Sequence, residues 1–375
     1  MFEKKNESIK SLLWSLPVAA MLVLTYPALG QQRAASPAFK DYDVIQYVRS
    51  TEIGPANILQ LDNNGDIVLA VRGGATRAQL AAQGVSFSES QIALLKTFRL
   101  IDEKDDTLRT LIPVLGQDKT RVLRERARSI ALPLARRLKP KIRELREELA
   151  RTGQEKHAYS IIFSYVLDGL VWDEFEKNQI LRPRRITAET PLWAGQVWAL
   201  FPRRPFYAGT NSMSDQGVSL KVTWAEEAIP QMLPFVADIA TLARLFDDYQ
   251  RIGLVKDGRA REVFGPFGLF DDSGHFTIPV IDERQSNRLY RSARGIAAGA
   301  AKEVPALLNL ADLVREFGFQ DKEQALVVAY HELLWDVMDQ LEELALVEKP
   351  VAFATPKQAR PADIAALVFI VKGTQ

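Results

Sequence analysis

Short blocks of sequence recur in the same order along this chain at a nearly constant spacing. Residues 112–115, Ile-Pro-Val-Leu, recur 166 positions later as Ile-Pro-Val-Ile at 278–281. At the same offset, five of nine residues are identical between 123–131 and 289–297. Two dipeptides follow at offsets of 163 and 165: Trp172-Asp173 with Trp335-Asp336, and Thr190-Pro191 with Thr355-Pro356. Because loop insertions and deletions shift such an offset slightly, the pattern predicts an internal duplication.

The duplication predicts two tandem, sequence-related domains, one over 31–203 and the other over 204–375. Each holds apolar stretches with helical spacing and a few short stretches typical of strands. We therefore predict an α+β fold in which helices predominate. The chain has no Cys, so disulfides, a thiol nucleophile and Cys-bound metals are excluded, and an ordinary apolar core must hold the fold.

Local patterns predict the elements of the first domain. Apolar runs on either side of Asp62-Asn63-Asn64-Gly65 predict a β-hairpin over 58–71. Ser88, with Gln91 three residues later, is typical of a capping box that begins a helix. The segment 112–115 reads as a short buried strand, and a helix with an apolar stripe follows from Leu123 onward. Pro133 and Pro140 should divide or kink this helical region, and Gly153 should end it.

The remaining elements are predicted in pairs, one in each half. A broadly apolar helix should surround each repeated Trp, with Trp172 and Trp335 as core anchors. Closing strands are expected at 196–201 and 366–371. In the second half, alternation over 218–224 predicts a half-buried strand, and the segment from Gly209 to Asp215 reads as a polar loop.

The first thirty residues resemble an export signal. A segment with Lys4, Lys5 and Lys10 precedes an uncharged, mostly apolar stretch that ends at Ala28-Leu29-Gly30. A positive start, an apolar core and a small-residue exit are the parts of a secretory signal peptide. We predict cleavage after Gly30 and a periplasmic or extracellular protein; the alternative is an uncleaved membrane anchor.

Net charge bears on the class of partner. Without residues 1–30, which contain three Lys and two Glu, 45 basic residues face 45 acidic ones. This balance argues against a general nucleic-acid binder. The charges are unevenly spread, with twelve Lys/Arg against five Asp/Glu over 117–151 and ten Asp/Glu against two Lys/Arg over 312–348. The basic segment could contact a membrane surface peripherally, and a simpler hypothesis is that it contacts the acidic segment. Most often, however, such charge runs are solvated helix faces.

Catalytic signatures are weak. His331-Glu332 resembles the start of a zinc-protease helix, but the required second His is replaced by Trp335. Glu332 and Asp336 share a helix face with four-residue spacing, so His331, Glu332 and Asp336 are the best, though poor, metal candidates. His157 and His275 could join them only through tertiary structure. Ser212 and Asp215, in the polar segment, are the other weak catalytic candidates.

An aromatic and basic stretch is the strongest ligand-binding candidate. Aromatic faces beside guanidinium groups can stack on flat ligands, and the stretch lies at the predicted junction of the halves, where a cleft would form. Plain packing between the halves is the competing interpretation. The residues are Trp193, Trp198, Arg203, Arg204, Phe206 and Tyr207.

These observations favour an exported, non-catalytic protein that binds an envelope ligand or protein partner and needs no cofactor. The alternative is a cell-envelope hydrolase, with or without a metal ion. No sequence feature identifies the ligand or substrate.

Overall fold

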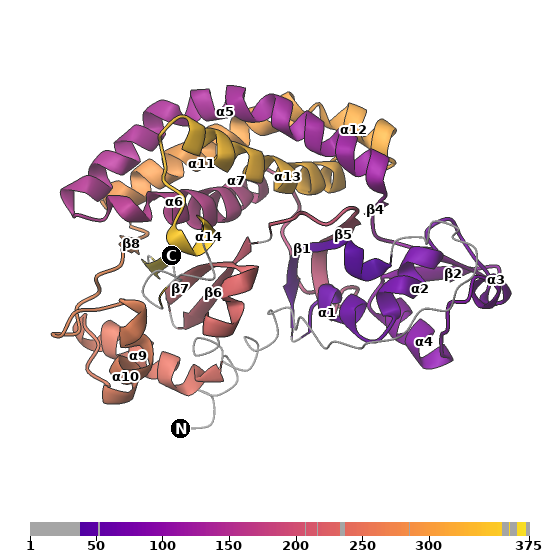
Figure 1. Cartoon of the computed structure of the whole chain (residues 1–375), viewed down its shortest axis with the longest axis horizontal. Coiled ribbons are helices and arrows are strands. Elements are labelled where there is room, and N and C mark those ends of the chain that lie inside the picture. Colours follow the sequence, from indigo (N-terminus) through magenta and orange to yellow (C-terminus); the bar gives the residue numbers. More distant parts are fainter. Residues whose placement is uncertain are drawn as a thin grey trace. The chain divides into compact units, whose positions relative to one another are not determined.

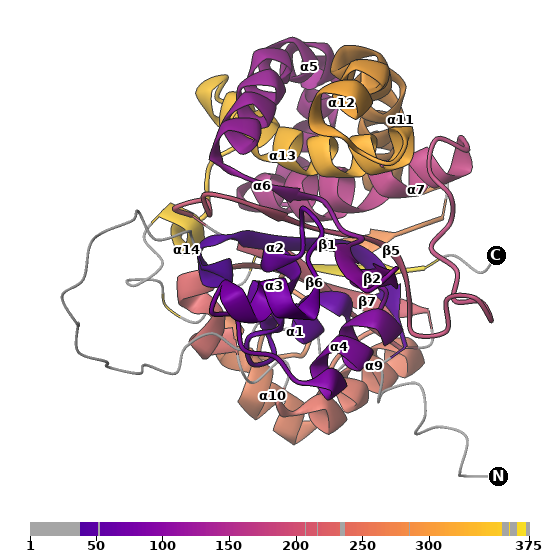
Figure 2. The ribbon, with the colours of Figure 1, turned by 90° about the vertical axis from the view of Figure 1, so that its right-hand side faces the viewer.

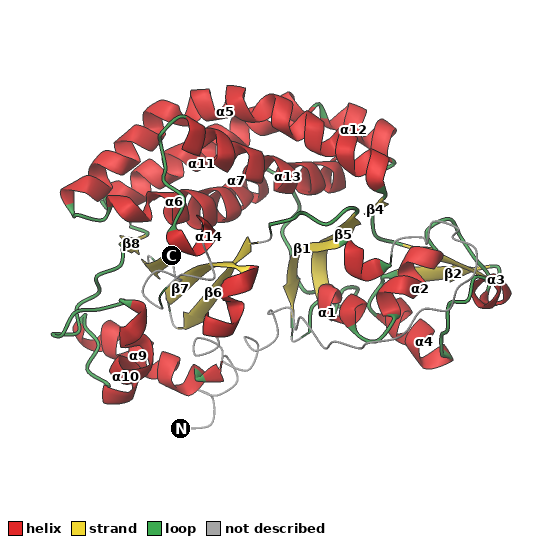
Figure 3. Ribbon diagram, in the orientation of Figure 1, coloured by secondary structure: helices red, strands yellow, loops and turns green. Residues whose placement is uncertain are grey.

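The computed structural model describes residues 38–372 apart from residues 52, 207, 216, 233–236, 285, 355–359 and 361–365. It is a mixed α and β structure in which helices predominate, as the sequence predicted (Figures 1 and 3). The predicted signal peptide lies outside the described residues. Among those that are described, no helix combines the length and the apolar character needed to cross a bilayer.

The chain divides into two compact units. The smaller unit comprises residues 38–122 and 184–204, and the larger unit comprises 123–183 and 205–372. The compact units therefore cut across the two predicted sequence halves, because residues 123–183 pack with the second half.

The smaller unit is built on a three-stranded sheet in the order β1-β5-β4. Strand β5 pairs antiparallel with β1, Ile45 opposite Trp198, and parallel with β4, Val114 opposite Ala199. A separate hairpin, β2-β3, follows helix α4. The elements are η2 (Phe39–Asp41), β1 (Asp43–Ser50), α1 (Pro55–Gln60), α2 (Asn64–Ala70), α3 (Arg77–Ala82), α4 (Glu89–Thr97), β2 (Ile101–Lys104), β3 (Thr107–Thr110), β4 (Val114–Leu115) and β5 (Trp193–Leu200).

The larger unit has a four-stranded sheet in the order β6-β7-β9-β8. Strand β9 pairs antiparallel with β7, Leu220 opposite Phe369, and parallel with β8, Val280 opposite Phe369. Helix α5 (Gln117–Arg151) runs from the smaller unit into this one. The other elements are η3 (Glu155–His157), α6 (Ala158–Ser160), η4 (Ile161–Leu170), α7 (Val171–Lys177), β6 (Ala208–Asp215), β7 (Val218–Ala225), η5 (Glu226–Met232), α9 (Ile239–Ile252), α10 (Gly258–Phe264), η6 (Gly265–Phe267), β8 (Val280–Asp282), α11 (Arg288–Leu308), α12 (Leu310–Phe317), α13 (Lys322–Glu343), α14 (Val351–Ala354) and β9 (Ala366–Val371).

Helices cover both faces of the larger unit's sheet (Figures 1 and 2). Helices α5, α11, α12 and α13 gather on one side together with η4, which contacts both β7 and α11, while α9 contacts β7 on the other side. The broadly apolar helices predicted around the repeated Trp residues are thus central. Trp172 is 4% exposed and meets Tyr330 edge-on, with ring centroids 4.7 Å apart. Trp335 is half-buried against Phe163.

Several local predictions are confirmed. Ser88 Oγ accepts from the Gln91 backbone N–H, and Gln91 Oε1 accepts from the Ser88 N–H, which forms the capping box. Both Ile-Pro segments lead into short strands, and both closing strands are present. The strand predicted at 218–224 is β7, and Gly153, with a φ of +69°, follows the end of α5.

The hairpin predicted over 58–71 is wrong, because this segment forms helices α1 and α2. Short apolar runs fit either a helix or a strand. Gly65 lies inside α2 rather than in a turn. A Cβ at this position would come within 1.9 Å of the Phe39 ring. Close packing on Phe39, rather than turn geometry, explains this glycine.

Two other predictions need correction. The segment 209–215 is not a loop but most of strand β6, paired with β7 so that Ser212 is opposite Lys221; as an edge strand it tolerates a polar sequence. Of the two outcomes predicted for Pro133 and Pro140, division is wrong, because α5 continues through both positions. Both prolines are exposed, so water can satisfy the carbonyl groups that they leave unbonded.

Candidate functional site

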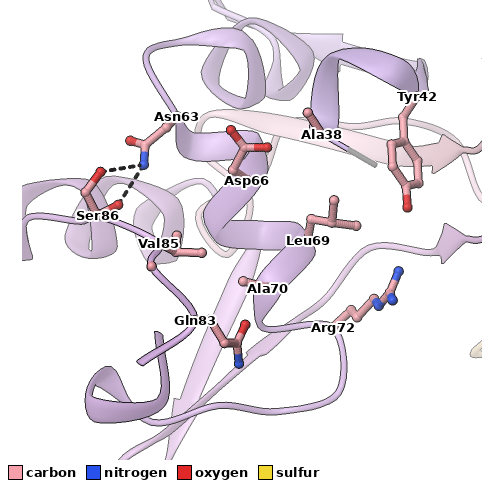
Figure 4. Close-up of a pocket in the computed structure, with 11 residues that line it drawn as sticks. Ala38, Tyr42, Asn63, Asp66, Leu69, Ala70, Arg72, Gln83, Val85 and Ser86 are labelled. Atoms are coloured by element: carbon pink, nitrogen blue, oxygen red, sulfur yellow. Dashed lines mark hydrogen bonds between the residues drawn. The ribbon is translucent and has the colours of Figure 1, made fainter. Parts of the chain in front are cut away.

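A pocket of about 680 Å³ opens in the smaller unit (Figure 4). It lies beside helix α2, between the start of the described chain and the loop that joins α3 to α4. Its walls contain charged, polar and apolar groups, but no His, Cys or Lys. The lining residues are Ala38, Tyr42, Asn63, Asp66, Leu69, Ala70, Arg72, Gln83, Gly84, Val85 and Ser86.

Packing around Phe39 positions the side of the pocket that contains Ala38 and Tyr42. Phe39 is 7% exposed, and its ring lies against Gly65 of α2. Its backbone N–H donates to Asp66 Oδ1 at 2.9 Å. These contacts hold the short helix η2 on α2, and η2 in turn positions Ala38 and Tyr42 in the pocket wall.

Tyr42 contributes a buried hydroxyl group to the pocket. The residue is 3% exposed, and its ring packs against Phe39 and Phe201, with centroids 6.1 and 5.2 Å away. Its hydroxyl is buried and has no hydrogen-bond partner in the structure. Burial raises the pKa of the phenol, while Arg72 partly opposes this shift through its positive charge and a weak hydrogen-bonding contact. The hydroxyl therefore stays protonated at neutral pH and can donate a hydrogen bond to a ligand.

The opposite side of the pocket is rigidly hydrogen-bonded. Asn63 Nδ2 donates to the Ser86 carbonyl at 2.6 Å, and Gln91 Nε2 donates to Asn63 Oδ1 at 2.8 Å. Figure 4 shows Asn63 and Ser86 on one side of the pocket and Tyr42 and Arg72 on the other, with Leu69 and Ala70 between them. The pocket thus pairs fixed polar ends with an apolar floor, which is typical of small-molecule sites.

The aromatic and basic stretch predicted to bind ligand is divided between the units. In the smaller unit, Trp198 is fully buried and Trp193 is 6% exposed. Trp193 Nε1 donates to the Phe98 carbonyl at 2.7 Å, and Arg99 lies over its ring, 5.0 Å from the centroid. These contacts are those of residues packed in the core of the smaller unit, and the core around Trp193 is made of residues from the first sequence half alone.

The other members of that stretch also have protein partners. The Arg203 guanidinium lies 3.8 Å from Asp43, and the Arg204 N–H donates to the same carboxylate at 2.8 Å. Phe206, in the larger unit, contacts Phe353, with centroids 6.0 Å apart. Tyr207 lies outside the described residues.

The metal candidates on α13 take part in ion pairs. Glu332 is fully buried and accepts from Arg124 Nε at 2.8 Å, and Asp336 lies 3.9 Å from Arg128. His331 Nδ1 lies 3.8 Å from Glu332. No group of three or more His, Asp or Glu residues suited to a metal ion occurs in the described part of the chain.

The contact between the basic and acidic segments, the simpler of the two charge hypotheses, is confirmed. Arg124 and Arg128 of α5 face α13, and Arg126 Nη2 donates to Glu316 of α12 at 2.5 Å. At the far end of α5, Arg146 donates to the Ala345 carbonyl at 2.9 Å. Helices from the two sequence halves are thus joined by charge as well as by apolar packing.

A second polar cluster, which the sequence did not indicate, surrounds Lys221 of β7. Its amine lies near Gly169, where a Cβ would come within 3.4 Å of Nζ. Gly169 belongs to the π-helix η4, and its neighbour Asp168 has non-helical dihedral angles (φ −94°, ψ 19°) and accepts from Trp172 Nε1 at 3.1 Å. Burial lowers the pKa of Lys221, although Asp168 and Asp173 oppose the shift. π-Helical turns occur frequently at functional sites.

Ion pairs link helices α3 and α4 to the hairpin β2-β3. Arg77 pairs with Glu89 and Glu103, and Lys96 also pairs with Glu103, at 2.5 to 2.8 Å. These pairs neutralise Arg77 and Lys96, whereas Lys104 and Arg109 of the hairpin are exposed.

Comparisons with known proteins add no relative: no family model, no curated protein and no solved structure matched the chain. The candidate site therefore rests on the geometry of the smaller unit alone. The sequence contained no indication of this pocket, because the segment predicted as a hairpin contains four of its lining residues: Asn63, Asp66, Leu69 and Ala70.

Proposed function

We propose that this chain is an exported, non-catalytic binding protein that holds a small ligand in the pocket of its smaller unit. The observation that carries this proposal is the Tyr42 hydroxyl. It is buried in the pocket wall without a partner, and an unsatisfied buried hydroxyl is unfavourable by about 1–3 kcal/mol. A bound acceptor would remove that penalty. The signal-like pattern of residues 1–30 is the basis for proposing export.

We also propose that the chain arose by duplication of one strand-and-helix module, and the pairing within the two sheets supports this. Each Ile-Pro segment leads into a strand that pairs parallel with its closing strand, and the closing strand pairs antiparallel with an opening strand. The Pro113 carbonyl accepts from the Ala199 N–H, and the Pro279 carbonyl accepts from the Phe369 N–H, both at 2.9 Å. A long helix follows each Ile-Pro strand, α5 in one half and α11 in the other.

A fragment screen tests the binding function. A few hundred small polar fragments would be soaked into crystals of the protein, with Ala70→Trp as a variant that fills the pocket. We expect the hits to concentrate between Tyr42 and Ser86 and to be lost in Ala70→Trp. The matched control Ala93→Trp changes an exposed residue of α4 that does not line the pocket, and it should keep the hits. Fragments that collect elsewhere, or that ignore Ala70→Trp, would overturn the proposal.

A further inference from the structure

The pocket presents two groups that complement an anion at one of its sides. Arg72 follows α2 at the rim, and its side chain lies on the same side as the Tyr42 hydroxyl (Figure 4). Arg72 lies close enough to oppose the raised pKa of Tyr42, through its charge and through a weak hydrogen-bonding contact, but no hydrogen bond of ordinary geometry joins the two groups. Arg72 makes no ion pair with any of the described residues, whereas Arg77, a few residues later, is paired twice.

We infer that the ligand carries a carboxylate, which binds between the Arg72 guanidinium and the Tyr42 hydroxyl. This inference rests on the binding function proposed above. A guanidinium presents parallel N–H donors that match the two oxygens of a carboxylate, and a phenol supplies one further donor. Together they satisfy one carboxylate group.

A phosphate fits this site less well. It carries up to two negative charges and three acceptor oxygens, and a single guanidinium would face it. Asp66, near the start of α2, also lines the pocket. Its negative charge repels a dianion more strongly than a monoanion. Asp66 Oδ1 accepts from the Phe39 N–H, so this carboxylate is held in place.

The remainder of the ligand would lie along the floor of the pocket. Leu69 and Val85 supply apolar surface, while Gln83 and the Asn63–Ser86 pair supply polar groups at the other side. A small organic acid with an apolar or mixed body suits this arrangement. Affinity would come from the ion pair and from covering Leu69 and Val85.

Calorimetric titration with three matched probes tests the inference: benzoate, benzamide and phenylphosphonate. All three carry the same ring, so they differ only in the group that meets Arg72 and Tyr42. We expect benzoate to bind at least tenfold more tightly than either of the others. Arg72→Gln should abolish this preference, and Tyr42→Phe should reduce benzoate affinity about ten- to hundredfold, as for loss of one hydrogen bond to a charged group.

The control variant is Arg109→Gln, an exposed arginine of β3 outside the pocket, which should leave the preference for benzoate unchanged. Equal binding of benzoate and benzamide, or tighter binding of phenylphosphonate, would overturn the carboxylate inference while leaving the binding function intact. If no probe binds and the fragment screen also leaves the pocket empty, both fail.

Discussion

Arg124 Nε donates a 2.8 Å hydrogen bond to Glu332 Oε2, although the two residues are 208 positions apart in the chain. Glu332 is fully buried, and the Arg124 side chain is 16% exposed. This ion pair joins α5, from the first half of the sequence, to α13, from the second. The stability of the helical layer of the larger unit should therefore depend on both Arg124 and Glu332.

Removing one member of this pair should be strongly destabilising. Arg124→Met leaves the Glu332 carboxylate buried without its counter-charge, so the free energy of unfolding should fall by about 3 kcal/mol. The double variant Arg124→Met/Glu332→Leu should recover most of that loss, because no buried charge remains. Urea denaturation measures both effects.

The matched control is Arg137→Met. Arg137 lies on α5, like Arg124, and its exposed side chain forms an ion pair with Glu303 of α11. Exposed ion pairs contribute at most about 1 kcal/mol. If Arg124→Met is no more harmful than Arg137→Met, Glu332 does not depend on Arg124.

His157 should make stability depend on pH. Burial lowers its pKa from 6.5 to about 4, and its Nε2 is buried without a hydrogen-bond partner. The unfolded chain therefore takes up a proton before the folded chain does, and stability falls as the pH drops from about 6.5 towards 4. Between pH 7.5 and pH 4.5 the loss from this residue is about 2–3 kcal/mol.

His157→Gln should remove this part of the pH dependence, as measured by urea denaturation at both pH values. The comparison is His275→Gln, because the His275 side chain is 63% exposed beside Asp271. Identical pH profiles for wild type and His157→Gln would show that burial does not hold His157 neutral.

Lys221 is expected to lower the stability of the larger unit. Burial lowers the pKa of its amine, so at neutral pH the fold either buries a charge or gives up a proton, and both are unfavourable. The corresponding position of the other sheet, judged from the strand register, is held by the apolar Ile45. Lys221→Met should therefore raise the free energy of unfolding by about 1–2 kcal/mol at pH 7.

The gain from Lys221→Met should shrink as the pH rises towards 10.5. Above the folded-state pKa the unfolded chain holds more protons than the folded chain, so wild-type stability rises with pH in this range. Thermal unfolding across pH 7 to 10 measures the trend, with the exposed Lys302→Met as the control. A destabilised Lys221→Met would mean instead that the lysine is needed to balance Asp168 and Asp173.

Gly65 should be essential to the shape of the pocket. A Cβ at this position would come within 1.9 Å of the Phe39 ring, whereas a Cβ at Gly73 would meet no atom within 4 Å. Gly65→Ala should displace Phe39 together with η2, destabilise the smaller unit by about 1–3 kcal/mol and weaken benzoate binding. Gly73→Ala should change neither. Unchanged binding in Gly65→Ala would show that η2 does not shape the site.

Patterns that span whole elements predicted this fold well. The apolar helices around Trp172 and Trp335, the capping box at Ser88 and the alternating strand from Val218 each have several residues that repeat one period or satisfy one hydrogen-bonding motif. The opposite charges of 117–151 and 312–348 also predicted a real contact. In these cases local sequence and tertiary structure favour the same conformation.

Sequence reasoning failed where tertiary contacts decide the outcome. From the sequence, Gly65 is predicted to be a turn residue, but in the structure it is helical and packs against the Phe39 ring. The pocket forms where η2, α2 and residues 83–86 pack together, and a periodic sequence pattern does not predict such packing between separate segments. Trp193 and Trp198 were predicted to bind a ligand, and in the structure both are buried in the smaller unit, where large aromatic side chains contribute much of the core.

The central claim is that the smaller unit binds a small ligand beside Tyr42, and hydrogen–deuterium exchange of the full chain tests it most directly. Saturating benzoate should slow amide exchange in peptides covering 38–42, 63–72 and 83–86, and should leave α5 and α13 unchanged. The same addition to Ala70→Trp should protect none of these peptides. Protection confined to other segments, or an equal response in Ala70→Trp, would contradict the account.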